Sequence, residues 1–156
     1  MALINVTLPD GTVNEYAAGV TCAEVITDAL GRKHGCLAAR LDGVECDLSS
    51  VLDSDCSVEG ILTESDEGIH ILRHSAAHLL AQAVMALYPN AKPTIGPAID
   101  RGFYYDFAME QIVESDLKAI QKKMQELARK NFTVERVELT DEELQDHFVD
   151  NPYKLE

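Results

Sequence analysis

The stretch "ALINVTLPDGTVNEYAAGVTCAEVITDALG", residues 2–31, predicts a β-hairpin followed by a helix. Its first seven residues alternate and are rich in β-branched side chains, "PDG" is a turn signal, and "TVNEYA" predicts the returning strand. Thr21 and Glu24 form a T-x-x-E capping box before a short helix, which the glycine at the end of the stretch should terminate. The stretch therefore predicts a small sheet covered by one helix.

The following residues complete this pattern. "CLAARLDGVECDL", residues 36–48, predicts a second hairpin that turns at Asp42-Gly43, and "SVEGILT", residues 57–63, predicts a closing strand. The order β-β-α-β-β-β fits a small α+β roll with one helix packed on a mixed sheet. We therefore expect a first domain over residues 1–63.

A different pattern begins after "ESDEG", residues 64–68, which we interpret as a short acidic linker. The remaining residues, 69–156, predict an α+β domain that is short of partner strands and therefore incomplete. The expected elements are a helix over 69–88, a strand centred on "FYYDF" at 103–107, an amphipathic helix over 114–131 with an apolar stripe of Leu117, Ile120, Met124 and Leu127, a strand over 132–139, and a last short helix capped by Thr140 and Glu143.

The composition is that of a globular protein, with 46% apolar residues, 26% charged residues and a net charge of −14. This charge argues against a protein that coats DNA or RNA generally, because affinity for phosphate backbones comes from lysine and arginine. No apolar run approaches the roughly 20 residues that span a membrane. The four cysteines form no C-x-x-C pair and no signal peptide precedes them, so we expect free thiols and a cytoplasmic location.

Two histidines lie four residues apart in "RHSAAHLL", residues 73–80. His74 and His78 share a helix face with an alanine and a methionine, where a free surface would carry lysine and glutamate, so we expect them to line a cavity. The i, i+4 spacing suits two imidazoles converging on one ion or substrate, although two ligands make at most half of a zinc site. Two helix histidines satisfied by backbone and water remain the alternative. The main aliphatic stripe of this helix is expected to be Leu72, Ala76, Leu79, Ala83 and Leu87.

Other candidate residues carry weaker signals. Tyr105 faces away from its two neighbours if "GFYYDF" is a strand, so it could line the same cavity as the histidines. His34, His70 and His147 are isolated and are expected to be structural. The basic residues Lys118, Lys122, Lys123, Arg129 and Lys130 are expected to form a solvated helix face rather than an RNA contact.

The combined pattern resembles a known family. "VTLPDGTVNEYAAGVT", with the helix and strands that follow it, resembles a TGS domain, a ubiquitin-like β-grasp module. "ILRHSAAHLLAQAVMALYPNAKPTIGPAIDRGFYYDF", with "KNFTVERVELT" and "NPYKLE", resembles the first part of the editing domain of threonyl-tRNA synthetases. The resemblance implies an N-terminal region of an enzyme that attaches threonine to its tRNA with ATP. In bacterial-type members the second N-terminal domain hydrolyses serine that was wrongly attached to this tRNA.

The resemblance also implies roles for particular residues. His74 and His78 match the paired histidines of the editing cleft, and Tyr105 and Lys154 match positions around it. The family's C-x-x-x-H element is missing, since no cysteine follows Cys56. We therefore expect an incomplete site that is inactive alone and holds no cofactor or metal, with His74 and His78 as the only candidate metal ligands.

The implied catalytic domain would lie beyond residue 156 and would bind ATP and zinc. The expected partners are threonine tRNA, the remaining synthetase domains and a second copy in a homodimer, with no membrane and no DNA. Two alternatives remain: a freestanding TGS protein that binds RNA or acts in regulation, and a small zinc hydrolase that uses His74 and His78.

Overall fold

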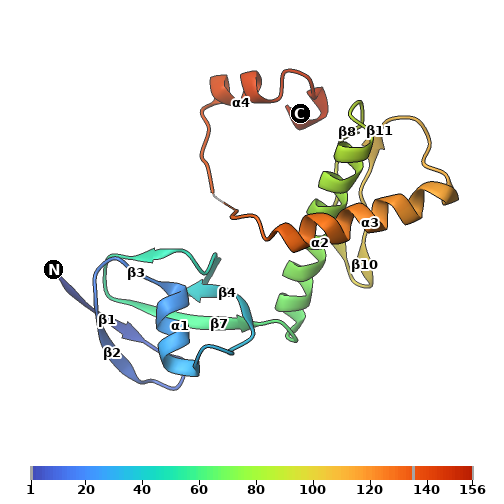
Figure 1. Cartoon of the computed structure of the whole chain (residues 1–156). Coiled ribbons are helices and arrows are strands. Elements are labelled where there is room, and N and C mark those ends of the chain that lie inside the picture. Colours follow the sequence, from blue (N-terminus) through green and yellow to red (C-terminus); the bar gives the residue numbers. More distant parts are fainter. Residues whose placement is uncertain (1, 135, 156) are drawn as a thin grey trace. The chain divides into compact units, whose positions relative to one another are not determined.

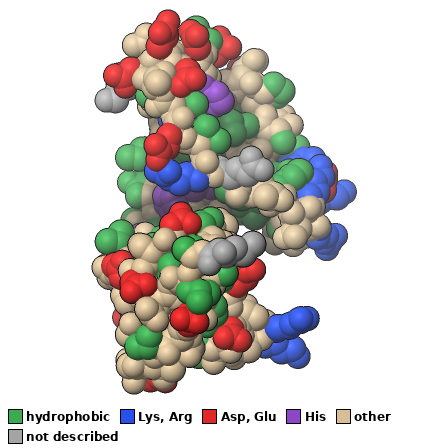
Figure 2. Space-filling model, turned by 90° about the vertical axis from the view of Figure 1, so that its left-hand side faces the viewer, with side chains coloured by type: hydrophobic (Ala, Val, Ile, Leu, Met, Phe, Trp, Pro, Cys, Tyr) green, Lys and Arg blue, Asp and Glu red, His purple; other side chains and the backbone are tan. Residues whose placement is uncertain are grey.

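The computed structural model describes residues 2–134 and 136–155, and it divides into two units, Met1–Leu72 and Arg73–Glu156. Acidic side chains are scattered over the face shown in Figure 2, in keeping with the net charge of −14. None of the helices in the described part of the chain combines the length and the apolarity that crossing a membrane would need.

The first unit is a five-stranded sheet with helix α1 (Cys22–Leu30) packed on it (Figure 1). The strand order is β2-β1-β7-β4-β5, in which β1 and β7 are parallel and the other pairs are antiparallel. This mixed sheet confirms the predicted β-grasp fold. The strands are β1 (Leu3–Thr7), β2 (Val13–Ala17), β4 (Cys36–Leu41), β5 (Val44–Cys46) and β7 (Cys56–Leu62).

The predicted local signals form as expected in this unit. Strands β1 and β2 pair from Leu3↔Ala17 to Thr7↔Val13 around the "PDG" turn. At the start of α1 the Thr21 hydroxyl accepts the Glu24 amide while the Glu24 carboxylate accepts the Thr21 amide, which completes the capping box. The hairpin at Asp42-Gly43 forms between β4 and β5.

The core of the first unit lies between α1 and the sheet. Alternation in β1 turns Ile4 and Val6 inward, where they are 3% and 0% exposed and pack with Val25 of α1 and Val58 of β7. A further small pair, β3 (Val20–Thr21) with β6 (Val51–Leu52), was not predicted, because two residues are too few to show a strand period.

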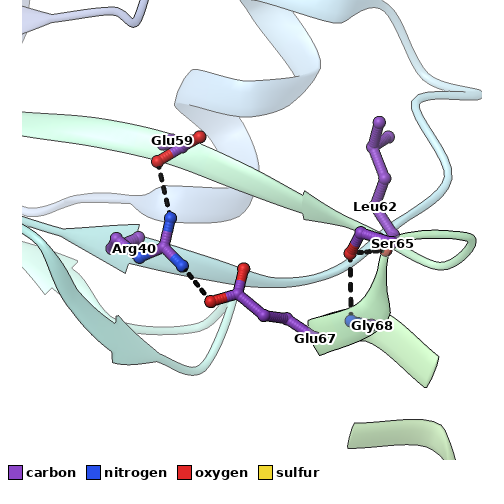
Figure 3. Close-up of polar contacts among 6 residues, drawn as sticks. All are labelled: Arg40, Glu59, Leu62, Ser65, Glu67 and Gly68. Carbon is purple, nitrogen blue, oxygen red and sulfur yellow. Dashed lines mark hydrogen bonds and ion pairs between the residues drawn. The ribbon is translucent and has the colours of Figure 1, made fainter. Parts of the chain in front are cut away.

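Helix α2 (Asp66–Leu87) begins inside the segment that was predicted to be a linker. The Ser65 hydroxyl accepts the Gly68 amide at 3.0 Å and donates to the Leu62 carbonyl at 2.7 Å, so Ser65 serves as an N-cap (Figure 3). Asp66 and two neighbours thus extend the helix upstream of residue 69, because the cap and the acidic first turn favour a helix start there. The boundary between the predicted domains stays a prediction.

Arg40 of β4 joins the first turn of α2 to the sheet. Its guanidinium pairs with Glu59 of β7 at 2.8 Å and also with Glu67 of α2 (Figure 3). Arg40 therefore links three elements of the first unit.

In the second unit the later turns of α2 pack on α3 (Glu114–Lys130), which crosses it in Figure 1. Ala83, Val84, Ala91 and Ile120 form the buried cluster. Ile120, Met124 and Leu127 of the predicted α3 stripe and Ala83 and Leu87 of the predicted α2 stripe belong to this cluster or pack against it, whereas Leu72 and Leu117 are 50% and 56% exposed. The contact face of α2 is rotated toward Leu80 and Val84, because the partner helix and not the sequence stripe decides which apolar face is covered.

The segment between α2 and α3 forms two short antiparallel ladders and not one strand through "FYYDF". Residues 104–106 lie outside the strands, and Asp106 exchanges backbone hydrogen bonds with Thr94 and Ile95 across the loop. The strands are β8 (Lys92–Pro93) with β11 (Phe107–Ala108), and β9 (Ala98–Ile99) with β10 (Gly102–Phe103).

The predicted strand over residues 132–139 does not form in its described part, 132–134 and 136–139; residue 135 lies outside the described residues. Phe132 and Val134 are 61% and 91% exposed, so their alternation meets no partner strand there. The predicted last helix does form, as α4 (Asp141–His147) with its Thr140–Glu143 capping box, and a 3₁₀ turn η1 (Pro152–Lys154) follows.

Candidate functional site

A cleft of about 1020 Å³ opens in the second unit between α2, the β8 region and the C-terminal turns. The wall formed by α2 includes His78, Ala81 and Met85, which are the neighbours that the sequence placed on the histidine face. The opposite wall includes Tyr105 and Lys154. Three of the four predicted site residues thus line one cleft, and the fourth, His74, touches His78.

The two histidines are in direct contact. Nε2 of His74 lies 2.9 Å from Nε2 of His78, and their rings meet edge to face with centroids 4.5 Å apart. One turn of helix separates the two positions, so the i, i+4 spacing brings the imidazoles together as predicted. A neutral imidazole carries one N–H, so this hydrogen bond requires one ring to carry its proton on Nε2 and the other ring to leave that atom bare.

The surroundings of His78 favour its neutral form. The residue is exposed as a whole, but neighbouring atoms remove part of the solvent around its ring, and this desolvation lowers the pKa of His78 below its ordinary value. Repulsion from His74, and then from Lys154, lowers the pKa further. A neutral imidazole at neutral pH can accept a proton, which is the property a general base needs.

Tyr105 connects the histidines to the opposite wall. Its ring lies 6.4 Å from the His78 ring and stacks on Phe107 at 5.0 Å, measured between centroids. Its hydroxyl lies 3.5 Å from Nζ of Lys154, and the same Nζ lies 5.9 Å from the ring centroid. Tyr105 therefore lies against both His78 and the ammonium group of Lys154.

The C-terminal turns are held in place by Asn151. Its side-chain amide donates to the Pro93 carbonyl at 2.9 Å, which positions η1, and with it Lys154, at the cleft. The Asn151 Oδ1 atom is buried and has no hydrogen-bond partner within the described residues. Sequence reasoning missed Asn151 and treated His147 as isolated, yet both line the cleft. No hydrophobic periodicity in the sequence around Asn151 or His147 indicated that either residue would lie near α2.

The described residues contain no group of three or more His, Cys, Asp or Glu side chains arranged to hold a metal ion. His74 and His78 supply two imidazoles beside the phenol of Tyr105 and the ammonium of Lys154, and His147 and Asp150, which also line the cleft, form no three-residue ligand group with them among the described residues. A zinc site usually needs four ligands, or three and a water, so this donor set does not match one. The zinc hydrolase hypothesis therefore has no support from the geometry.

The arrangement combines a proton acceptor, a cation and an aromatic hydroxyl around a cleft large enough for a small organic group. Such a set can activate a water molecule and stabilise negative charge that develops on a carbonyl oxygen. This is the chemistry of ester or amide hydrolysis.

Comparison with known proteins gives two results. Residues 4–63 match the model of the TGS domain. The chain is 45% identical over 159 aligned positions to the threonine–tRNA ligase of Streptococcus suis, and 43% identical over 158 to that of Burkholderia multivorans; each alignment covers 99% of this chain. That of Alkalilimnicola ehrlichii is 47% identical over 134 positions, 84% of this chain and 21% of the relative. The chain spans about a quarter of the length of the curated relatives it matches.

Proposed function

Because this chain carries a TGS domain and is similar over almost its whole length to part of threonine–tRNA ligases, we propose that it acts within such a ligase, as a tRNA-associated module and part of a proofreading site. The proofreading reaction is hydrolysis of serine that was wrongly joined to threonine tRNA. The convergence of His78, Tyr105 and Lys154 on one cleft, with His74 in contact, is the observation that carries this proposal. The two alternatives, a freestanding TGS protein and a zinc hydrolase, have less support from the comparisons.

The need for such a site follows from the size of serine and threonine. A pocket that accepts threonine cannot reject a side chain smaller by one methyl group by more than about 1–3 kcal/mol. Serine therefore enters the ligation site, and a second site must remove it. A hydrolytic cleft in the same protein meets this need.

The histidines would supply the proton acceptor in this reaction. Desolvation, and then repulsion from His74 and Lys154, lower the pKa of His78, so its neutral imidazole can take a proton from a water molecule that attacks the seryl ester. His74 would orient His78 through the Nε2–Nε2 hydrogen bond or would hold the terminal ribose of the tRNA. The proton taken from water then passes to the departing ribose oxygen, so the reaction yields free serine and intact tRNA.

Lys154 and Tyr105 would act on the substrate. The Lys154 ammonium lines the cleft and acts electrostatically on His78, and it would stabilise negative charge as water adds to the ester carbonyl. Tyr105 holds Lys154 through its hydroxyl and its ring. The ligation reaction itself, its ATP and the dimer partner would belong to other parts of the longer protein.

A chimeric ligase tests the proposal. The matching segment of the Streptococcus suis ligase would be replaced by this chain, and the release of serine from pre-formed seryl-tRNA would be measured at pH 7.5. We expect the chimera to hydrolyse seryl-tRNA and His78→Ala to slow hydrolysis by about 10²-fold or more, the usual contribution of a general base. Attachment of threonine to tRNA should continue in the same variant.

His70→Ala is the matched control, since His70 is an exposed histidine of the same helix and is not among the cleft residues. Its rate should equal that of the unsubstituted chimera. A chimera in which His74→Ala and His78→Ala together leave seryl-tRNA hydrolysis unchanged would show that these residues do not form the proofreading site.

A further inference from the structure

Helix α3 is basic within a strongly acidic chain. From Leu117 to Lys130 one residue, Glu126, is acidic, whereas the whole chain carries a net charge of −14. The visible face in Figure 2 likewise shows acidic side chains scattered and the lysines and arginines gathered in a few groups. The basic residues of this stretch are Lys118, Lys122, Lys123, Arg129 and Lys130.

Three of these residues form a stripe on the outer face of α3. At about 100° per residue, Lys118, Lys122 and Arg129 fall within about 40° of one another. Ile120, which is buried against α2, and half-buried Leu127 lie on the opposite side. Lys118, Lys122 and Arg129 are all exposed. They are spread along the helix over roughly 16 Å, at a rise of about 1.5 Å per residue.

The other two basic residues are engaged within the helix. Lys123 pairs with Glu126 at 2.9 Å and Lys130 pairs with Glu126 at 3.6 Å. Among the described residues, the ion pairs of α3 are these two, so the charges of the stripe are directed to solvent. Glu126 thus partly neutralises Lys123 and Lys130, whereas Lys118, Lys122 and Arg129 form no ion pair among the described residues.

The sequence alone favoured a solvated face here, but because three of the five cations form one row that is unpaired within the described part of the chain, we propose that the Lys118–Lys122–Arg129 stripe is an RNA-binding surface that contacts a phosphodiester backbone. A row of solvent-facing cations on a rigid helix suits a polyanion with regularly spaced charges, and arginine and lysine are the residues that bind phosphates. The identity of the RNA as threonine tRNA rests on the proposed function. The stripe itself reads no base, so it supplies affinity and not sequence recognition.

The surface is separate from the cleft. On α2, Ala83 and Val84 face α3, whereas His78, Ala81 and Met85 line the cleft on roughly the opposite side of the same helix. The stripe therefore lies beyond α3 and contacts none of the cleft residues. Changes in the stripe should alter RNA affinity without altering the chemistry of the histidines.

The test measures binding of fluorescently labelled threonine tRNA and of an unrelated RNA hairpin to the whole chain between 50 and 200 mM KCl. The stripe variant is K118Q/K122Q, and the matched control is K123Q/K130Q, which removes the same charge from the same helix. Glutamine keeps the helix propensity nearly constant, and circular dichroism verifies folding. We expect the stripe variant to lose about tenfold in affinity for both RNAs at 100 mM salt, and its salt slope to fall by about 1.4–1.8, as for two lost phosphate contacts.

Adding R129Q should weaken binding further, whereas the control should bind nearly as well as the original chain. Equal losses in the two double variants would mean that net charge alone governs binding, and this would overturn the proposal. Unchanged RNA binding by the stripe variant would also overturn the proposal. So would binding of the original chain to anionic phosphatidylglycerol vesicles that is as tight as its RNA binding, or tighter, and that is lost in the stripe variant. If RNA binding depends on the stripe but the chimeric ligase does not hydrolyse seryl-tRNA, the RNA-binding surface would be supported and the proposed proofreading site would be rejected.

Discussion

The ring of Tyr105 lies directly against the backbone of Gly96: a Cβ atom at position 96 would be 2.0 Å from Cδ2 of Tyr105. No side chain fits in this space unless the ring moves. Because the Tyr105 hydroxyl also meets Lys154, the absence of a side chain at position 96 helps to set the position of the cleft's cation.

Gly96→Ala should therefore destabilise the second unit by about 1–3 kcal/mol, the usual range for overpacking. Urea unfolding followed by tyrosine fluorescence would measure the change. In a Tyr105→Ala background the same substitution should cost much less, because the clashing ring is gone. Equal costs in both backgrounds would show that Gly96 matters for another reason.

The stability of the chain should depend on pH through His78. Its folded-state pKa is below the ordinary value of 6.5, so the unfolded chain binds more protons as the pH falls through this range. The free energy of unfolding should therefore decrease from about pH 7 downward through about pH 6.5. Urea titrations at several pH values would show a flatter profile for His78→Asn. Identical profiles for the two proteins would contradict the lowered pKa.

Gly68→Ala should disrupt the start of α2. A Cβ atom at this position would lie 1.9 Å from the Leu62 carbonyl oxygen, and a backbone atom cannot move aside as a side-chain tip can. We expect a loss of about 1–3 kcal/mol or more in the unfolding free energy, and faster hydrogen exchange in the first turn of α2.

Arg40→Gln provides the comparison for this site. It removes the ion pairs to Glu59 and Glu67 without a steric clash, and partly exposed pairs of this kind contribute about 0–1 kcal/mol. If Arg40→Gln lowered the unfolding free energy more than Gly68→Ala does, the ion pairs, and not backbone packing, would be what holds the first turn of α2 against the sheet.

The Cys22 thiol should resist alkylation in the folded chain. Burial, with the neighbouring Cys46 and Cys56 thiols, raises the pKa of Cys22 to about 12, so almost no reactive thiolate is present at pH 8. Mass spectrometry after a timed exposure to iodoacetamide should find Cys46 modified well before Cys22. In urea the two should react at similar rates. Equal rates in the folded chain would show that Cys22 is accessible.

The first unit could be predicted closely from its sequence because its signals are local. The "PDG" turn, the Thr21–Glu24 capping box and the Asp42-Gly43 hairpin each lie within a few residues, and each forms as expected. The contact between His74 and His78 could be predicted for the same reason, since it depends only on local helix geometry: one helical turn brings the two rings together.

The second unit depends on contacts between distant residues, and prediction failed where these decide the structure. "FTVERVEL" alternates like a strand, but its described residues find no partner strand, so they remain exposed. On α2, Leu72 of the predicted stripe is 50% exposed whereas Val84, outside that stripe, is buried against α3, so the position of α3 helps to determine which apolar residues are covered. A hydrogen bond from the Asn151 side chain to the Pro93 carbonyl holds Asn151 at the cleft, and no sequence pattern near residue 151 predicts this contact.

That bond also sets the order in which the cleft can assemble. Asn151 and Pro93 are 58 residues apart, and chains grow by about 5–20 residues per second during translation. Roughly 3–12 s therefore pass between synthesis of Pro93 and synthesis of Asn151. Through this interval the histidine-bearing helix and Tyr105 exist without the C-terminal turns that carry Lys154. A single protease cut within residues 136–139 would likewise remove the covalent link between the histidine-bearing helix and the turns that carry Lys154, although every residue of the site would remain intact.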